Sequence, residues 1–186
     1  MSFFFQATEA SPFACLEVFS PEECDEIIRI GNSGLVDAMV RRGDESQIDE
    51  DIRKSKIAWL SANGNDWVYK KLSDAVIFLN EHHFKFDLTG FAEDLQFTKY
   101  PAGGKYGPHI DCTPGRIRKL SVSVQLSNED SYKGGDLDIN YGHEIVLPRK
   151  QGTIIAFPSI AVHSVRPVTE GVRFSLVGWI TGPRFR

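Results

Sequence analysis

The stretch YGPHIDC places His109 and Asp111 two residues apart, directly after a segment rich in glycine. In an extended chain, residues i and i+2 face the same side, so the imidazole and the carboxylate can converge on one point. Both side chains are common metal ligands. The same pair can also be polar residues of a surface turn, or an isolated ion pair. A metal site is indicated only if the rest of the chain supplies a third ligand.

His163 is the candidate for that third ligand. It lies 54 residues after His109, in the strand-like segment AVHSVRP. Two histidines and one carboxylate leave three adjacent coordination positions open on an iron ion, which is the arrangement of non-haem Fe(II) oxygenases. Two of these positions can take a chelating 2-oxo acid, and the third can take O2. Together His109, Asp111 and His163 predict an iron site.

The far carboxylate of such an acid needs a cation. Arg173 and Ser175 share one face of the strand-like segment RFSLVGWIT, in which Arg173 is the only charged residue. A guanidinium buried without an anionic partner would be costly. The partner can be an Asp or Glu of the chain, or a ligand carboxylate that the planar guanidinium holds through two hydrogen bonds. Trp179 lies on the same row as Arg173, as a wall of the site or as part of the core.

These residues belong to a region, from about 94 to 182, that reads as short strands. Apolar and polar residues alternate there, and Gly, Pro, Asn and Asp separate the segments. The segments are LQFTKY, KLSVSVQLS, DLDINY, HEIVLP, GTIIAFP, AVHSVRPV and RFSLVGWIT. Such a series predicts an antiparallel sandwich or barrel. We expect a mainly β (α+β) fold with helical support.

Two helices are predicted ahead of the strands, within residues 13–88. In the first, Ser20 is the expected N-cap, Pro21 takes the first helical position and Glu23 completes a capping box. Either Gly31 or Gly34 is expected to end it. The second helix should start near residue 65 or 66, because the apolar residues that follow have helical spacing. These apolar residues are Val68, Leu72, Ala75, Val76 and Leu79.

Residues 41–53, between the two helices, are dense in charges of both signs and have no period. The pattern predicts a mobile loop. It is either a solvated connection or a flap near an active site, since loops of this length are often lids. Residues 1–186 contain no linker that would divide them, so we expect a single domain.

Composition limits the partners. A net charge of -4 and a pI near 5.7 give no electrostatic reason to expect nucleic acid. The three cysteines are widely spaced and form no CxxC motif, which is typical of reduced thiols. The sequence contains neither a signal peptide pattern nor an apolar run of about 20 residues, so we expect no membrane partner and a cytoplasmic location.

The chain resembles the 2-oxoglutarate/Fe(II)-dependent dioxygenases, in particular their prolyl 4-hydroxylase-like branch. The segments that carry the likeness are IRKSKIAWL, LQFTKYPAGGKYGPHID, SVSVQLSNEDSYKGGDLDI and GTIIAFPSIAVHSVRPVTEGVRFSLVGWI. The resemblance implies a double-stranded β-helix, or jelly roll, in which His109, Asp111 and His163 hold iron. It also implies that Arg173 binds the C5 carboxylate of 2-oxoglutarate. Tyr100 matches a tyrosine that often lines the cosubstrate pocket, and Gln125 stands where some relatives have a tyrosine.

The activity implied by the resemblance is hydroxylation of an unactivated C–H bond with Fe(II), 2-oxoglutarate and O2, releasing succinate and CO2. A prolyl residue in a peptide or protein is the expected substrate, with Arg53 and Trp179 as contacts and ascorbate as a reductant. Two alternatives stay open at this point. One is a hydroxylase of a free amino acid or another small molecule, and the other is a non-catalytic jelly-roll binding module. The compact chain suggests a bacterial or phage origin.

Overall fold

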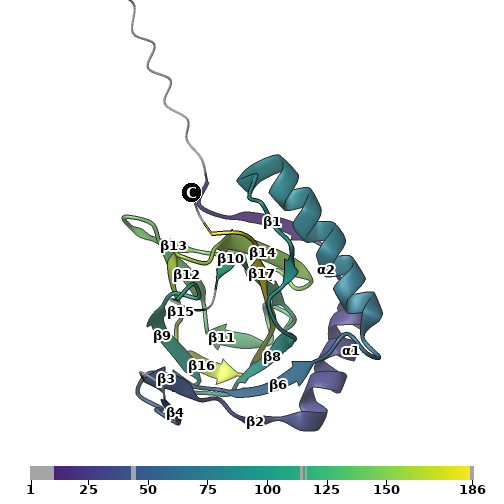
Figure 1. Cartoon of the computed structure of the whole chain (residues 1–186). Helices are drawn as coiled ribbons and strands as arrows, with labels where there is room; N and C mark the ends of the chain where they lie inside the picture. Colours follow the sequence, from purple (N-terminus) through teal and green to yellow (C-terminus); the bar gives the residue numbers. More distant parts are fainter. Residues whose placement is uncertain (1–10, 43–44, 114, 116, 185–186) are drawn as a thin grey trace, which may run out of the picture.

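The computed structural model describes residues 11–42, 45–113, 115 and 117–184, and it consists of two facing antiparallel sheets with two helices outside one of them (Figure 1). The larger sheet has the order β1-β14-β10-β17-β8-β6-β2, and β7 pairs with β17. Its strands are β1 (Ala14–Glu17), β2 (Val36–Asp37), β6 (Lys56–Leu60), β7 (Gly90–Phe91), β8 (Leu95–Tyr100), β10 (Arg118–Gln125), β14 (Thr153–Pro158) and β17 (Arg173–Thr181).

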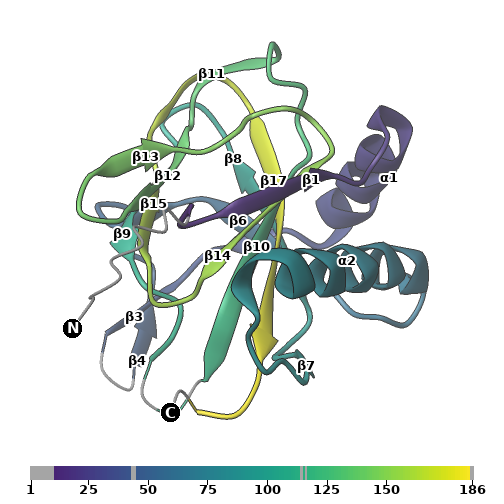
Figure 2. The same cartoon turned by 90° about the horizontal axis from the view of Figure 1, so that it is seen from above.

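The smaller sheet has the order β13-β12-β15-β9-β5. Its strands are β5 (Arg53–Lys54), β9 (Lys105–His109), β12 (Leu137–Asn140), β13 (Glu144–Val146) and β15 (Val162–Val165). Two further pairs are β3 (Val40–Arg42) with β4 (Glu45–Gln47), and β11 (Tyr132–Gly134) with β16 (Val168–Gly171). Viewed from above, β9, β12, β13 and β15 of the smaller sheet lie on one side and the helices on the other, with strands of the larger sheet between them (Figure 2). The mainly antiparallel jelly roll that the sequence predicts is confirmed.

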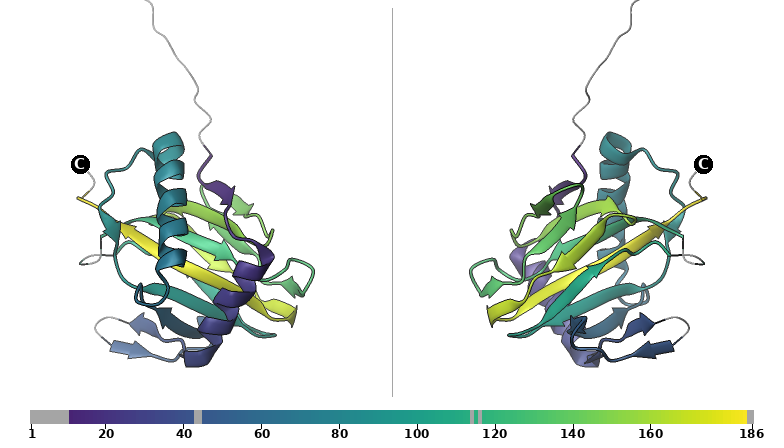
Figure 3. Two further views of the ribbon diagram at one scale, coloured as in Figure 1. Left: turned by 90° about the vertical axis from the view of Figure 1, so that its right-hand side faces the viewer. Right: turned by 90° about the vertical axis from the view of Figure 1, so that its left-hand side faces the viewer.

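The two helices cover the outer face of the larger sheet (Figure 3). They are α1 (Pro21–Gly31) and α2 (Asp66–Leu79), which continue into a short 3-10 helix, η1 (Asn32–Gly34), and a short π-helix, η2 (Asn80–Phe84). The predicted capping box is present, because the Ser20 side chain accepts from the Glu23 amide and the Glu23 carboxylate accepts from the Ser20 amide. The second helix begins at Asp66, as its apolar spacing predicts.

Gly31 ends α1, but not through the left-handed conformation usual for such glycines. Its φ is -65°, and the cap residue Asn32 is also right-handed. A Cβ at Gly31 would lie 2.2 Å from the Phe97 ring, so the glycine is required by close packing of α1 on β8. The helix–sheet interface contains the main apolar core. Its largest fully buried members are Ile27, Val68, Leu72, Leu95, Phe97, Leu120, Leu126, Ile154 and Leu176.

The segment 41–53 departs from the prediction of an irregular loop. It contains most of the β3–β4 hairpin and then a turn in which the Asp49 carbonyl accepts from the amides of Ile52 and Arg53. Strands of three residues are too short to show an alternation of polar and apolar side chains, and the many charged residues made this segment look like a loop. Residues 43–44 lie outside the described residues, so the proposed mobility of this segment stays a prediction. No helix in the described part of the chain is long and apolar enough to cross a membrane.

Candidate active site

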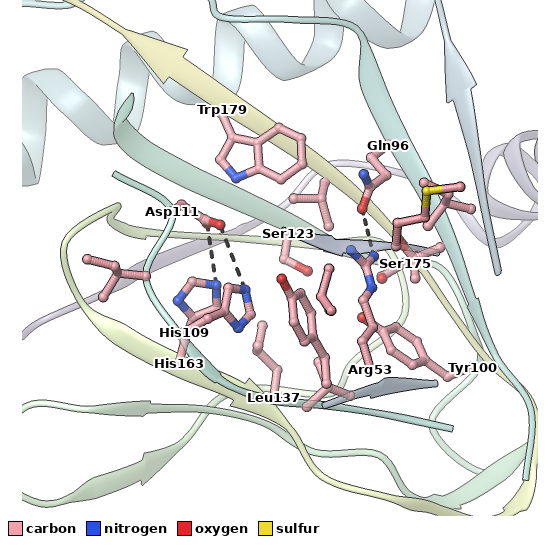
Figure 4. Close-up of a pocket in the computed structure, with 18 of the residues that line it drawn as sticks. Arg53, Gln96, Tyr100, His109, Asp111, Ser123, Leu137, His163, Ser175 and Trp179 are labelled. Carbon is pink, nitrogen blue, oxygen red and sulfur yellow. Dashed lines mark hydrogen bonds and ion pairs between the residues drawn. The ribbon is translucent and has the colours of Figure 1, made fainter. Parts of the chain in front are cut away.

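The two predicted histidine ligands are brought together by strand pairing. His109 ends β9 and His163 lies in β15, where the two residues are direct cross-strand partners. Asp111 follows β9, and its amide donates to the Ser159 carbonyl at 2.9 Å. The ligand atoms of these three residues all lie within 4.8 Å of one another. Figure 4 shows both imidazoles pointing toward the Asp111 carboxylate, 3.8 Å from His109 Nε2 and 3.3 Å from His163 Nε2.

Both imidazoles are oriented by main-chain carbonyls. His109 Nδ1 lies 2.9 Å from the Gly107 oxygen, and His163 Nδ1 lies 3.0 Å from the Ala161 oxygen. A carbonyl can only accept, so each Nδ1 carries the proton and donates it. In the neutral imidazoles, each Nε2 is therefore left with its lone pair facing the cluster. Outer hydrogen bonds of this kind are typical of histidines that bind a metal.

Two serines that the sequence reading missed hold the carboxylate in place. Ser121 Oγ donates to Asp111 Oδ2 at 2.6 Å, and it lies 2.9 Å from Ser159 Oγ. Ser121 belongs to the polar row of β10, so its side could be predicted from the alternation. Ser159 lies in the turn after β14 and carries no such signal, because only the folded turn brings it next to Asp111.

The charges of the cluster follow from burial and from proximity. Burial, followed by the nearby His163, lowers the pKa of His109 to about 4. Burial also disfavours the charged form of His163, but the hydrogen bond and charge of Asp111 outweigh it and raise the pKa of His163. Although burial opposes its charge, Asp111 has a lowered pKa because both histidines and Ser121 stabilise the carboxylate. The cluster therefore offers a carboxylate and a neutral His109 imidazole at neutral pH.

Arg173 lies at the start of β17 and is only 1% exposed. Its Nη2 donates to Gln125 Oε1 at 3.0 Å, while Nε and Nη1 are buried without a partner. Within the described residues, no Asp or Glu forms an ion pair with it, so the interpretation as an internal salt bridge gains no support. Tyr100 is its cross-strand partner, and the guanidinium carbon lies 5.4 Å from the centre of the Tyr100 ring. A buried cation with two free donors fits a carboxylate ligand.

Ser175 and Thr98 extend this polar surface. They are cross-strand partners on β17 and β8, and Ser175 also pairs with Gln125 of β10. Both are fully buried, and Thr98 Oγ1 has no hydrogen-bond partner. The predicted residues Arg173, Ser175, Tyr100 and Gln125 are thus neighbours around one part of the same surface.

Trp179 and Arg53 line the same cavity from two sides. Trp179 is 6% exposed, its Nε1 has no partner, and the guanidinium of Arg118 stacks on its ring at 3.8 Å. Arg118 also forms an ion pair with Glu93. Arg53 donates from Nε to Ser55 Oγ and from Nη2 to Gln96 Oε1, both at 2.9 Å. Figure 4 shows Arg53 reaching from the smaller sheet to Gln96.

The cavity between the sheets measures about 700 Å³, and it is lined by all three members of the His–Asp–His cluster together with Arg173. This is the size of pockets that hold drug-sized ligands, and more than one small dicarboxylate needs. Four of its lining residues are large, apolar and 43% to 57% exposed. This apolar rim consists of Val36, Met39, Trp59 and Ile110.

Residues 95–181 match the model of the 2OG-Fe(II) oxygenase superfamily. The chain resembles this superfamily and its prolyl 4-hydroxylase-like branch. A PKHD-type hydroxylase from Parvibaculum lavamentivorans is 38% identical over 96 residues, which are 46% of this chain and 42% of the relative. Across the curated relatives compared, the matches span 39% to 60% of the relatives' length.

Solved structures share the fold over nearly the whole chain. A Pseudomonas putida prolyl-4-hydroxylase has a TM-score of 0.72 at 21% identity, covering 93% of this chain and 94% of that one. A Trichoplax adhaerens prolyl hydroxylase, in complex with a hypoxia inducible factor peptide fragment, has a TM-score of 0.74 at 18% identity. That likeness covers 92% of this chain and 84% of the other. At these identities the likeness establishes the fold.

The superfamily implies Fe(II), 2-oxoglutarate and O2, and the residues present fit these groups. Two Nε2 lone pairs and one carboxylate form the donor set that non-haem Fe(II) prefers. The unpartnered Nε and Nη1 of Arg173 supply two donors for a carboxylate in the same cavity.

Proposed function

We propose that the protein is an Fe(II)- and 2-oxoglutarate-dependent hydroxylase that acts on a prolyl residue in a peptide or protein and releases succinate and CO2. The observation that carries the proposal is the pairing of two features in one cavity. The cavity contains a His–Asp–His cluster with its donor atoms facing inward, and a fully buried arginine with two unpartnered N–H groups.

His109, Asp111 and His163 would hold the iron, and Arg173 would bind the far carboxylate of 2-oxoglutarate through its free N–H groups. Gln125 fixes the guanidinium by accepting from Nη2, and Ser175 and Tyr100 complete the wall. Bound iron with 2-oxoglutarate and O2 supplies the oxidative decarboxylation that drives C–H hydroxylation.

The chain's own contribution is orientation and protection. The Gly107 and Ala161 carbonyls fix the protonated Nδ1 of each histidine, and Ser121 occupies one oxygen of Asp111. Burial of the cluster keeps bulk water away from the reacting centre. No acid–base pair is required, because the cofactors carry the chemistry.

A peptide or protein substrate is supported by the entrance of the cavity. The apolar rim offers contacts that a small polar amino acid would leave exposed to water. Trp59 and Trp179 lie with ring centres 6.2 Å apart, and the Trp179 N–H is free to donate to a main-chain carbonyl. The Trichoplax relative binds a peptide on the same fold. Arg53 would be a further substrate contact, and a flap role for residues 41–53 agrees with the position of Ser46 in the cavity wall.

The proposal includes a reducing, cytoplasm-like compartment with ascorbate as a reductant that keeps the iron in the Fe(II) state. Support comes from Cys15, Cys24 and Cys112, all of which are free thiols.

The test is a turnover assay with Fe(II), 2-oxoglutarate, ascorbate and a panel of prolyl peptides and free proline. Succinate would be measured alongside a mass gain of one oxygen in the substrate. His143→Ala is the matched control for His163→Ala, because His143 lies exposed in the β12–β13 turn. We expect succinate from the wild type and from His143→Ala, and none from His163→Ala. Equal succinate from all three proteins would exclude the proposed function.

A further inference from the structure

Arg53 is a second buried guanidinium whose hydrogen-bond partners are all neutral. The residue is 7% exposed, and its hydrogen bonds go to the Ser55 hydroxyl and the Gln96 amide oxygen. Its guanidinium carbon also lies 4.4 Å from the centre of the Tyr106 ring. A charge removed from water without an anion is costly, so such a group in a cavity wall indicates a missing anionic partner.

Four other arginines with described side chains show how unusual this is, because each of them pairs with a carboxylate. Exposed Arg29 and Arg166 form ion pairs with carboxylates, and so does partly buried Arg149. Among the buried arginines of the described ranges, Arg118 pairs with Glu93, whereas Arg53 and Arg173 have no carboxylate. Both of these unpaired guanidiniums line the same cavity. Arg173 already has a role in the proposed function, but Arg53 has no defined ligand group.

The position of Arg53 places its charge beside the reacting centre. Tyr106 lies between it and the metal cluster, with its ring stacked 3.7 Å from that of His109. Arg53 extends from β5 of the smaller sheet to Gln96 on β8 of the larger one, and thereby crosses the cavity wall (Figure 4). A group held by Arg53 would therefore lie within the cavity, separated from the metal cluster by the ring of Tyr106.

The charge balance of the cavity agrees with this position. The positive charges in the cavity would be those of Arg53, Arg118, Arg173 and a divalent metal ion. The negative charges of the wall are those of Glu93 and Asp111, because Asp37 is neutralised by Lys56 at the surface. A dicarboxylate cosubstrate still leaves one positive charge unbalanced. A substrate with one carboxylate close to the reacting carbon would neutralise it.

We propose, on the basis of the proposed function, that the Arg53 guanidinium binds a carboxylate of the substrate. The carboxylate belongs to one of two sources with the same chemistry. The proposed function favours the side chain of an Asp or Glu next to the target residue of a peptide, and the α-carboxylate of a free amino acid is the second source, which the test distinguishes. In either case the guanidinium donates to the carboxylate, and Ser55 and Gln96 hold it in place.

The test uses protein loaded with Mn(II) and N-oxalylglycine, which permits binding without turnover. Calorimetry would compare probes that differ only in one carboxylate. L-proline is paired with L-prolinamide, and capped peptides with Glu next to Pro are paired with their Gln counterparts. The variants are Arg53→Gln and, as the matched control, Lys54→Gln, which removes a neighbouring positive charge that lies exposed beside Glu50.

We expect one carboxylate probe to bind wild type about 10- to 100-fold more tightly than its amide, as loss of a charged hydrogen bond implies. Arg53→Gln should abolish this difference, and Lys54→Gln should keep it. The probe pair that shows the difference identifies the source. Equal or absent binding of both members of every pair would overturn the proposal. So would a large loss of N-oxalylglycine affinity in Arg53→Gln, which would assign Arg53 to the cosubstrate. Failure of wild type to bind Mn(II) and N-oxalylglycine would instead contradict the proposed function itself.

Discussion

The two faces of β10 are equally buried, but they are filled differently. Leu120 and Val124 follow one face, which Leu126 continues just after the strand, and all three pack into the helix-backed core with no exposed surface. Ser121, Ser123 and Gln125 follow the other face and are 1% to 5% exposed. Ser123 lines the cavity, while Ser121 and Gln125 form hydrogen bonds to Asp111 and Arg173, which line it. On the first face, side chains fill the space. On the second, polar groups surround a space that no side chain of the described chain fills.

This difference separates stability from function within a single strand. A well-packed apolar face loses free energy when any methylene group is removed. A polar face that lines a cavity gains little from packing, and its buried donors, such as those of Arg173, are costly until a ligand satisfies them. The apolar face should therefore govern unfolding, and the polar face should govern binding.

The largest effect is expected for His163→Ala. Loss of an outer-sphere partner of a metal ligand typically costs 10- to 100-fold in affinity, and loss of a ligand should cost more. We expect Fe(II) binding and turnover to fall below detection, while chelator-treated wild type and variant unfold at similar denaturant concentrations. Calorimetric metal titration and urea unfolding would check both halves. A large loss of stability without a loss of metal binding would reverse the proposed separation.

Leu120→Ala tests the apolar face, with Ser123→Ala as its partner on the opposite row. The leucine is completely buried in the core, so truncation should lower the free energy of unfolding by about 2–5 kcal/mol. The serine change should cost less than about 1 kcal/mol, because no packing is lost. Urea unfolding of both variants measures the comparison directly. Equal losses would show that the two faces do not differ in their contribution to stability.

The free energy of unfolding of the metal-free protein at acidic pH should depend on His109. Its pKa of about 4 lies below the ordinary value of 6.5, so the stabilisation it gives is complete above pH 6.5 and is lost as the pH falls toward 4. Relative to His109→Gln, the metal-free wild type should lose up to roughly 3 kcal/mol over this range. His163 has a raised pKa, so the stabilisation it gives is present at low pH and is lost as the pH rises. Relative to His163→Gln, the metal-free wild type should therefore lose stability as the pH rises. Urea unfolding with chelator at several pH values would reveal both, and parallel pH profiles would contradict the assignment.

Ser121→Ala should have the smallest effect of this series on binding. It removes the 2.6 Å hydrogen bond to Asp111 and leaves all three ligands in place. We expect metal affinity to fall by about tenfold, with a smaller change in the free energy of unfolding. Ser127→Ala is a control on the same row, since Ser127 bonds only to main-chain groups. An equal change in metal affinity for both variants would remove Ser121 from its positioning role.

Much of this arrangement could be predicted from the sequence, because it depends on local periodicity. The capping box at Ser20, the bounds of β17 and the polar row of β10 all follow from spacing along one element. The features that could not be predicted depend on contacts between distant segments. Ser159 contacts Asp111 only through a folded turn, and the neutral hydrogen-bond partners of Arg53 are visible only when β5 of the smaller sheet faces β8 of the larger one. Very short strands such as β3 and β4 contain too few residues to show the alternation of polar and apolar side chains by which a strand is predicted.

The iron and 2-oxoglutarate sites are best tested together by an anaerobic titration of the metal-free protein with Fe(II) and then 2-oxoglutarate, followed through the visible charge-transfer band of the chelate. We expect a band that requires both components. In Arg173→Met, iron affinity should be unchanged, while the 2-oxoglutarate concentration needed should rise by about 100-fold, as loss of two charge-assisted hydrogen bonds implies. No band at saturating 2-oxoglutarate, or an unchanged requirement in Arg173→Met, would contradict this assignment of the sites.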